Sequence, residues 1–423
     1  MGRALSLKTN FSWTFAGNVV YAGCQWGMLV VLAKLGSPEI VGQYALGLAI
    51  TAPVINLSNL SLRGVLATDV NGDYPFGDYL RLRVVTTALA MLAVVGIVAL
   101  TGYRRQTVLV ILAVALAKGV ESISDIAYGS LQQQERMDRI SHSMMLRGLV
   151  SIVALWVGVY FAGSVILGTL AMAAGWAVVL ALFDLPGLPQ LRSKSTSIAS
   201  MLPGPHGLDW PRLLRLAMIA APLGLVMMLL SLNTSIPRYV IQHSFGERSV
   251  GIFTAVAYLM VVGTTVVGAL GQSAFPRLAQ YFARGEVREF RILIRRLIAV
   301  GAALGAAGIL VAVSAGRPLL RVLFRSDYAA SSDVLTWMMI AAAISYVASF
   351  LGYGLTAARQ FKVQAPLFAV VTIVTAAASI GLIPGHGLLG AAWATVLAAI
   401  AQLVGSGVIL SHATRVQSAR VRS

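Results

Sequence analysis

The chain has 423 residues, of which 58% are hydrophobic and only 11% are charged, and its mean hydropathy is +0.81. A soluble domain of this length needs far more charge on its surface, so the composition indicates a membrane protein. The net charge of +17 would suit nucleic-acid binding, but the basic residues flank apolar stretches, where they serve better as anchors to anionic lipid headgroups. We therefore predict membrane lipids, and no nucleic acid, as partners.

Twelve apolar stretches are each long enough to cross a bilayer, which takes about 20 helical residues. Strands of a membrane barrel would instead show a weak alternation over about ten residues. We therefore predict an all-α polytopic membrane protein with about twelve transmembrane helices. The predicted spans are 12–33, 40–62, 84–102, 107–131, 143–162, 164–183, 213–236, 249–271, 297–315, 334–356, 365–383 and 388–410.

Basic residues are unequally divided between the two sides of these spans. Of the 32 Lys and Arg residues, Lys118 and Arg147 lie within spans, 22 lie on the side of both termini and 8 lie on the opposite side. The positive-inside rule therefore predicts that both termini are cytoplasmic. The single cysteine cannot form an internal disulfide, and the five histidines lack the spacing of metal ligands. No metal or cofactor is predicted.

Three sequence matches indicate an internal duplication. The segment from Val41 resembles the segment from Val250, "AYGSLQQQERM" resembles "GYGLTAARQFK" at Tyr128 and Tyr353, and "ILGTLAMAAGWA" resembles "LLGAAWATVLAA". The order is the same in both halves, so we expect two pseudo-symmetric six-helix lobes of one orientation around a central cavity. The predicted parts are an N-lobe at 1–184, a Pro-, Gly- and Ser-rich cytoplasmic linker at 185–211, a C-lobe at 212–412 and a basic cytoplasmic tail at 413–423.

Polar side chains recur on one face of several predicted spans. In span 107–131, Lys118, Glu121 and Asp125 share a helix face. A charge at the bilayer centre costs about 2.5–3.5 kcal/mol, so three charges facing lipid would cost about as much as the whole stability of many proteins. We therefore expect this stripe to face protein or water. The other candidates to line a substrate cavity are Asn18, Gln25, Asn56, Asn59, Arg63, Arg147, Tyr258 and Gln272.

The stripe has two explanations. Lys118 and Glu121 either form a structural ion pair or line a water-filled pathway, and Asn and Gln side chains also join helices by hydrogen bonds. Arg63 and Arg147 lie near the ends of their spans, where they either line the pathway or extend towards the headgroups. Asp125 has no cation on its own helix, and it is our candidate for a group that changes protonation during transport.

Two segments resemble polysaccharide exporters. They are "LKTNFSWTFAGNVVYAGCQWGMLVVLAKLGSPEIVGQYALGLAITAPV" and "AYGSLQQQERMDRISHSMMLRGLVSIV". Such exporters belong to the multidrug/oligosaccharidyl-lipid/polysaccharide exporter superfamily, which includes O-antigen-type flippases. The resemblance implies twelve spans in two lobes, a V-shaped cavity and alternating access.

It also implies a cargo of undecaprenyl-pyrophosphate-linked oligosaccharide for lipopolysaccharide or exopolysaccharide biosynthesis in the bacterial inner membrane. A proton or a sodium ion would be the coupling ion. Lys118, Arg63 and Arg238 are the candidates to meet the pyrophosphate. The span-10 counterparts of the stripe are Ala343, Tyr346 and Phe350, so its charges belong to one lobe only.

Other functions remain open at this point. A multidrug exporter of the same superfamily would use acidic cavity residues to bind cationic drugs. A membrane glycan polymerase or ligase usually needs a large extracytoplasmic catalytic loop, whereas the longest outer connection here is the short segment 316–333. A scaffold protein would not explain charges inside the membrane. We therefore predict a non-enzymatic flippase.

The charge asymmetry generates a test of topology. A reporter fused after Arg104 should be active on the outer side of the membrane, because that loop has few basic residues. Fusions at a series of loops would measure this, and a cytoplasmic signal after Arg104 or Arg248 would contradict the two-lobe arrangement.

Overall fold

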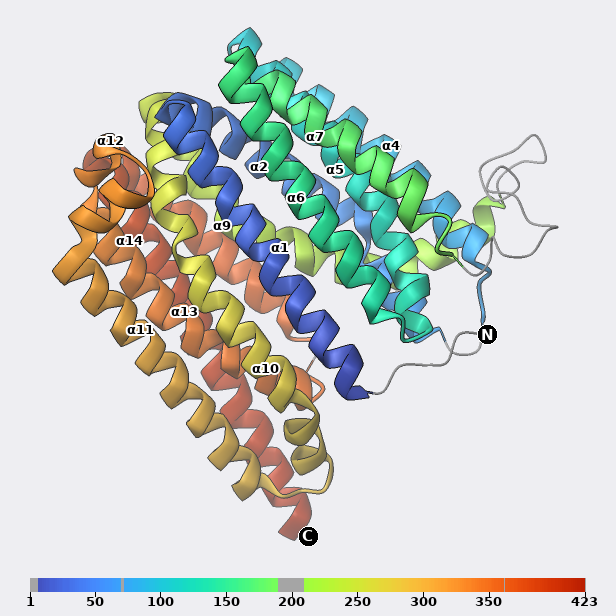
Figure 1. Ribbon diagram of the computed structural model, residues 1–423. Helices are drawn as coiled ribbons and strands as arrows, with labels where there is room; N and C mark the ends of the chain where they lie inside the picture. The colour runs from blue at the N-terminus through green and yellow to red at the C-terminus, as the bar shows by residue number, and fades with distance from the viewer. Residues whose placement is uncertain (1–6, 70–71, 189–208, 361, 423) are drawn as a thin grey trace. The chain divides into compact units, whose positions relative to one another are not determined.

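The computed structural model describes residues 7–69, 72–188, 209–360 and 362–422. All regular structure in these residues is helical, and they contain no strand. Figure 1 shows the helices, which are α1 (Leu7–Leu35), α2 (Pro38–Asn59), α3 (Leu62–Thr68), α4 (Phe76–Leu100), α5 (Arg105–Gln133), α6 (Met137–Ala162), α7 (Val165–Val179), the π-helix η1 (Leu180–Asp184), α9 (Trp210–Tyr258), α10 (Met260–Ala283), α11 (Val287–Leu323), α12 (Ser326–Ala329), α13 (Ser332–Ala357) and α14 (Gln364–Arg422).

Ten helical stretches among the described residues are long and apolar enough to cross a membrane. Two of them, Trp210–Ala283 with 74 residues and Gln364–Ser418 with 55 residues, are too long for one crossing, because 74 helical residues would rise about 110 Å. Each contains a glycine with a positive φ, Gly246 at 77° and Gly387 at 58°. The helical backbone is broken at these glycines, so each stretch provides two spans. The prediction of an all-α protein with about twelve spans is confirmed.

The chain divides into two compact units, residues 1–231 and residues 232–423. The first unit includes the start of α9, which the sequence analysis assigned to the second lobe. The proposed lobes at 1–184 and 212–412 stay a prediction. Most of the proposed linker at 185–211 lies outside the described residues.

One helix lies at the centre of each unit. In the first unit α5 packs against α2, α3, α4 and α7, while α1 packs against α6. In the second unit α13 packs against α10, α11 and α14. The sequence match at Tyr128 and Tyr353 lies on α5 and α13, so the two central helices correspond in the predicted duplication. The charged stripe therefore lies on the central helix of the first unit.

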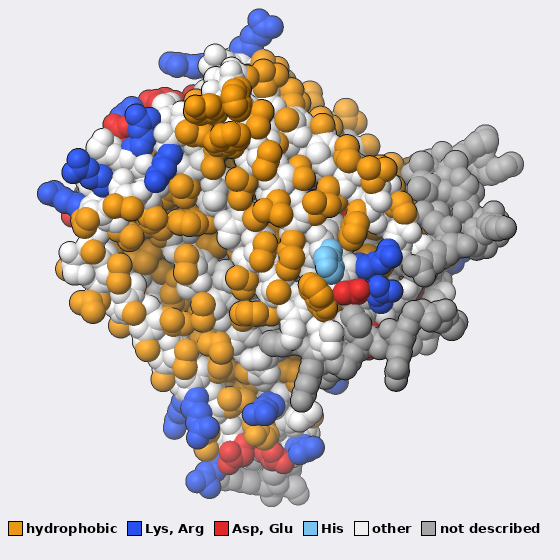
Figure 2. All heavy atoms as spheres, viewed as in Figure 1, with side chains coloured by type: hydrophobic (Ala, Val, Ile, Leu, Met, Phe, Trp, Pro, Cys, Tyr) orange, Lys and Arg blue, Asp and Glu red, His pale blue; other side chains and the backbone are white. Residues whose placement is uncertain are grey.

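The outer helix faces carry large apolar side chains that would be buried in a soluble protein. Leu92 of α4 is 68% exposed and Leu310 of α11 is 69% exposed. Figure 2 shows hydrophobic side chains spread over the helical flanks, with Lys and Arg gathered near the helix ends. This distribution is typical of helices that contact lipid.

The helical path between α2 and α3 is broken at two consecutive residues. Leu60 and Ser61 have φ of 51° and 49°, a left-handed conformation that costs about 1–2 kcal/mol for a residue with a side chain. Gly224 of α9 lies against this break, where an added Cβ would come within 3.0 Å of the Leu60 Cα. The break changes the direction of the chain just before Arg63, and it thereby sets where that side chain lies.

Two glycines allow α6 and α7 to touch at the backbone. A Cβ added at Gly158 would meet the Gly168 Cα at 2.2 Å. Neither backbone can move away easily, since both helices are packed along their length. Small residues at such crossings replace the hydrophobic drive that is absent between helices in lipid.

We expect Gly158→Leu to lower the thermal stability of the purified protein by at least about 1–3 kcal/mol, because overpacking a close contact strains both helices. Gly96→Leu in α4 is the matched control, since nothing lies within 4 Å of its added Cβ. Thermal unfolding in detergent would measure both. Equal stability of the two variants would contradict the close crossing.

Candidate functional site

The first unit contains a polar cavity of about 550 Å³ between α2, α3, α5 and the start of α9. Its walls are partly apolar, formed by Ala52, Ile55 and Met227, and otherwise polar. Six residues that the sequence analysis singled out line this one cavity: Asn56, Asn59, Arg63, Lys118, Glu121 and Asp125. Three helices therefore bring their polar faces to a common space, and the charges of α5 face this cavity.

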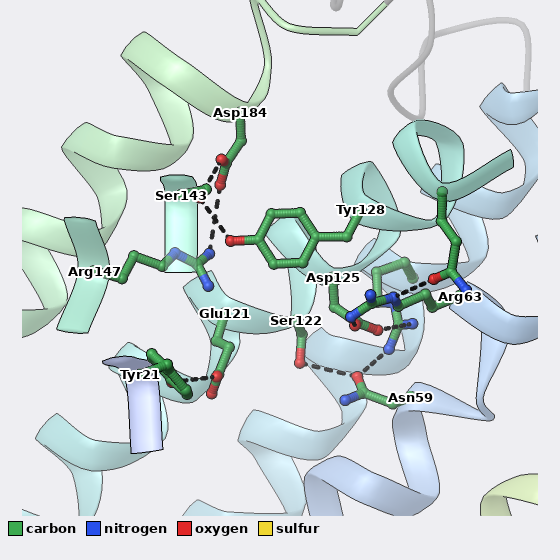
Figure 3. A network of polar contacts seen from close by, with 12 residues as sticks. Tyr21, Asn59, Arg63, Glu121, Ser122, Asp125, Tyr128, Ser143, Arg147 and Asp184 are labelled. Atoms are coloured by element: carbon green, nitrogen blue, oxygen red, sulfur yellow. Dashed lines mark hydrogen bonds and ion pairs between the residues drawn. The ribbon is translucent and has the colours of Figure 1, made fainter. Parts of the chain in front are cut away.

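Lys118 and Glu121 form an ion pair at the cavity wall. The Lys118 Nζ lies 2.6 Å from Glu121 Oε2, and both side chains keep about a quarter of their surface exposed. Tyr21 of α1 donates a second hydrogen bond to Glu121 Oε1 at 3.1 Å (Figure 3). Glu121 is therefore held from two sides, whereas Lys118 keeps ammonium hydrogens that point to no carboxylate. The structural pair and the cavity lining, which the sequence left as alternatives, coexist.

Asp125 is shared between two arginines. Its Oδ1 lies 3.5 Å from Arg63 Nη1, and its Oδ2 lies 3.2 Å from Arg83 Nη2. Arg83 also donates to the amide oxygen of Asn59, and Arg63 Nε donates to Gln132 Oε1 at 3.0 Å. Figure 3 shows these groups converging from α2, α3, α4 and α5. One carboxylate thus faces two guanidinium groups, which leaves a local excess of positive charge.

A second charged cluster lies beside the cavity in the core of the unit. Arg147 of α6 and Asp184 of η1 are 2% and 1% exposed, and Arg147 Nη2 lies 3.6 Å from Asp184 Oδ2. Ser143 donates to Asp184 Oδ1 at 2.5 Å and lies 2.6 Å from the Tyr128 hydroxyl. The suggestion that Arg147 extends to the headgroups is therefore wrong. It is buried because Asp184, on the next membrane span, supplies the opposite charge.

Aromatic rings connect the cations of the two clusters. The Tyr128 ring has the guanidinium of Arg63 and that of Arg147 each 5.5 Å from its centroid. The Trp176 ring lies 5.8 Å from Lys118 Nζ and 5.5 Å from Arg147. A ring face attracts a cation without neutralising it. These rings therefore stabilise closely spaced cations while leaving their charge available.

The two clusters together carry more positive than negative charge. Four cations, Arg63, Arg83, Lys118 and Arg147, lie with three carboxylates, Glu121, Asp125 and Asp184. The formal excess is one positive charge. In a low-dielectric surrounding such an excess attracts an anion strongly. Among the described residues, no group of His, Cys, Asp and Glu could hold a metal ion.

The remaining predicted residues are dispersed. Asn18 is exposed on α1, and Gln25 is half-buried one turn from Tyr21 and interacts with it. Tyr258 and Gln272 lie in the second unit, on α9 and α10. Arg238, the third candidate cation, also lies in that unit and donates to Thr254 Oγ1 at 3.1 Å. The structure brings none of these four candidates into the cavity of the first unit.

Sequence analysis missed two charged residues of the site. Arg83 was placed at a membrane surface, but α4 begins at Phe76 and buries Arg83 completely. Asp184 was placed at the end of a span, where a charge needs no explanation. The alternation of charge could have given a signal, because Arg83 and Arg147 are cations near apolar stretches and Asp125 lacked a partner on its own helix.

Comparison with known proteins places this fold. No protein-family model matches the chain. A capsular polysaccharide biosynthesis protein of Staphylococcus aureus, CapF, is 27% identical over 383 residues, which cover 90% of this chain and 94% of that protein.

Solved structures share the fold at lower identity. The lipid II flippase MurJ in an inward closed conformation has a TM-score of 0.72 at 14% identity, over 96% of this chain and 89% of MurJ. The Vibrio cholerae multidrug transporter VcmN has a TM-score of 0.65 at 13% identity, over 97% and 96% of the two chains. The eukaryotic MATE transporter AtDTX14 also has a TM-score of 0.65, at 14% identity over 98% of both chains.

This chain is a multi-pass membrane protein with the twelve-helix, two-lobe fold of the multidrug/oligosaccharidyl-lipid/polysaccharide exporter superfamily. Within that superfamily, the resemblance to its polysaccharide transporters is confirmed by the similarity to CapF.

The buried pair of Arg147 and Asp184 generates a stability test. Asp184→Asn should lower folded abundance, corresponding to about 3–5 kcal/mol, because it leaves a buried charge without its partner. The double variant Arg147→Met with Asp184→Leu should recover most of the loss. Abundance in membranes and thermal unfolding would measure this.

The matched control is Asp138→Asn. Its partner Arg136 lies 2.9 Å away, and both side chains keep more than a fifth of their surface exposed. Little change is expected there. A double variant as unstable as Asp184→Asn alone would contradict a compensating pair.

Proposed function

We propose that this protein is a flippase for a lipid-linked oligosaccharide in the inner membrane of a bacterium. It would move an undecaprenyl-pyrophosphate-linked oligosaccharide across the bilayer by alternating access, without covalent chemistry. The superfamily fold and the similarity to CapF, a capsular polysaccharide biosynthesis protein, support this proposal. MurJ, which shares the fold, is a lipid II flippase.

The observation that carries the proposal is the polar cavity with its excess of positive charge. A sugar headgroup needs hydrogen-bonding groups in place of water, and the amides of Asn56 and Asn59 and the hydroxyl of Ser122 line the cavity. A pyrophosphate needs cations, which Lys118 and Arg63 supply from the cavity wall. The prenyl chain requires no polar partner and can stay in lipid.

The contacts suggest separate roles for the charges. Lys118 has one carboxylate partner and free hydrogens, so it can bind a phosphate oxygen while Glu121 holds it in place. Arg63 shares Asp125 with Arg83, so a phosphate can replace the 3.5 Å contact of Arg63 without leaving Asp125 unpaired. Asp125 then acts by positioning two cations, which is a different role from the change of protonation considered from the sequence.

A multidrug exporter is the second candidate. Glu121 and Asp125 line the cavity and could bind a cationic drug, and several solved structures with this fold are multidrug transporters. Both carboxylates, however, already have cationic partners. A cationic drug would have to displace a lysine or two guanidinium groups, whereas an anion has only to join them. The charge balance therefore favours an anionic cargo.

Deletion and complementation in the host bacterium would test the proposal. Loss of the gene should leave lipid-linked oligosaccharide on the cytoplasmic leaflet while its synthesis continues. Complementation with Lys118→Ala should restore membrane abundance but lower export by about tenfold or more, as expected for a lost charged hydrogen bond. Lys34→Ala, which removes an exposed lysine at the end of α1, is the control and should export normally.

A second variant distinguishes transport from packing. Lys118→Met with Glu121→Leu removes both charges without leaving one unpaired, so it should fold but not transport. Full export by this double variant would contradict the role of the pair in transport. Normal surface glycan in the deletion strain, together with new sensitivity to cationic drugs, would favour the multidrug exporter.

A further inference from the structure

The second unit contains a basic pocket that lies apart from the polar cavity of the first unit. It is formed where α11 begins and α14 ends. A cavity of about 360 Å³ is lined by Phe290, Arg291, Ile294, Arg295, Gly407, Leu410, Ser411, Thr414 and Arg415. An adjoining cavity of about 520 Å³ shares Arg291 and Arg295 and adds Arg288 and Ser418. Both helices belong to the same unit, so the pocket is a feature of that unit alone.

The floor of the pocket is apolar. Phe290, Ile294 and Leu410 are buried to 5% exposure or less and belong to the core of the unit. Gly354 of α13 lies against two of them, because an added Cβ would be 3.0 Å from the methyl groups of Ile294 and Leu410. This floor is closely packed and cannot bind a polar group. Only its apolar surface is available to a ligand.

The rim of the pocket is basic and lacks counter-charges. Arg288, Arg291, Arg295 and Arg415 are exposed, and none of them forms an ion pair with a carboxylate in the part of the chain that the structure describes. The contact that orients the rim runs from Arg291 Nη2 to the buried hydroxyl of Thr414 at 3.3 Å. Guanidinium groups gathered without carboxylates repel one another, and a phosphate would relieve that repulsion.

The position of the pocket along the helices indicates where it lies in the bilayer. α11 changes from arginines at 291, 295 and 296 to an uninterrupted apolar sequence from Leu297. α14 makes the reverse change between Leu410 and Arg415. Figure 2 shows Lys and Arg gathered at this end of α11 and α14, next to the hydrophobic flank. The rim therefore lies at the level of lipid headgroups, and the floor at the level of the first acyl carbons.

We propose that this pocket binds the headgroup of an anionic phospholipid. Arg291, Arg295 and Arg415 hold the phosphate, and Ile294 and Leu410 contact the glycerol backbone and the first methylene groups. The apolar floor selects a phospholipid over free phosphate, which would gain nothing from it. The bound lipid would join the start of α11 to the end of α14. This inference is independent of the cargo that the protein moves.

Native mass spectrometry of the full-length protein with phosphatidylglycerol or phosphatidylcholine would test the site. The triple variant Arg291→Gln, Arg295→Gln and Arg415→Gln should retain phosphatidylglycerol at least about tenfold less than the unaltered protein. Arg277→Gln, Arg284→Gln and Arg296→Gln remove three exposed charges from the same region outside the pocket, and they should leave retention nearly unchanged. An equal loss in both triple variants would overturn the pocket in favour of general surface charge.

A second variant tests the pocket without changing any charge. Gly407→Leu places a side chain into the cavity, where the nearest atom to an added Cβ is 3.9 Å away, and it should weaken phosphatidylglycerol retention by a similar factor. Normal retention by Gly407→Leu would overturn the proposal even if the arginine variant failed to fold. Displacement of the lipid by inorganic phosphate at equal concentration would show a free-anion site instead, and would overturn the role of the apolar floor.

Discussion

The cost of placing charge in a bilayer governs the first unit of this protein. Each unpaired charge near the membrane centre costs about 2.5–3.5 kcal/mol even by lenient measures, yet seven charged side chains meet around α5, α6 and η1. They are tolerated because nearly every one has an opposite charge, an amide or an aromatic ring beside it. The helices of the unit are thus fixed relative to one another by polar contacts as well as by packing, and a cavity remains where the pairing is incomplete.

That incompleteness separates the site from a purely structural network. A network built only for stability would match its charges one to one, as Arg147 and Asp184 do in the core. At the cavity, Asp125 serves two arginines, and Lys118 keeps part of its surface exposed. The buried pair supports the positions of α6 and η1, while the partly exposed groups remain able to exchange partners. Stability and binding are therefore assigned to different residues of one continuous cluster.

Much of the fold could be predicted from sequence, because apolar stretches of sufficient length have few alternatives in a bilayer. The polar face of α5 was also visible, since its spacing follows the helical repeat. The partners of that face were not. Arg83 looks like a surface anchor until the start of α4 is known, and Asp184 lies after a π-helical turn that no residue pattern announced. Tyr21 meets Glu121 across a hundred residues of chain, and such contacts depend on how helices pack, which hydropathy does not encode.

The order of the partners along the chain has a consequence for biosynthesis. When α5 leaves the ribosome, Arg63 and Arg83 have already been made, so Asp125 can be neutralised as soon as its helix enters the membrane. Arg147 of α6 is in the opposite situation, because Asp184 is synthesised only at the end of the following span. Until then its charge needs Tyr128, water or headgroups as partners. Insertion of α6 should therefore be the step at which this protein depends most on the cell's insertion machinery, and α7 with η1 would complete it.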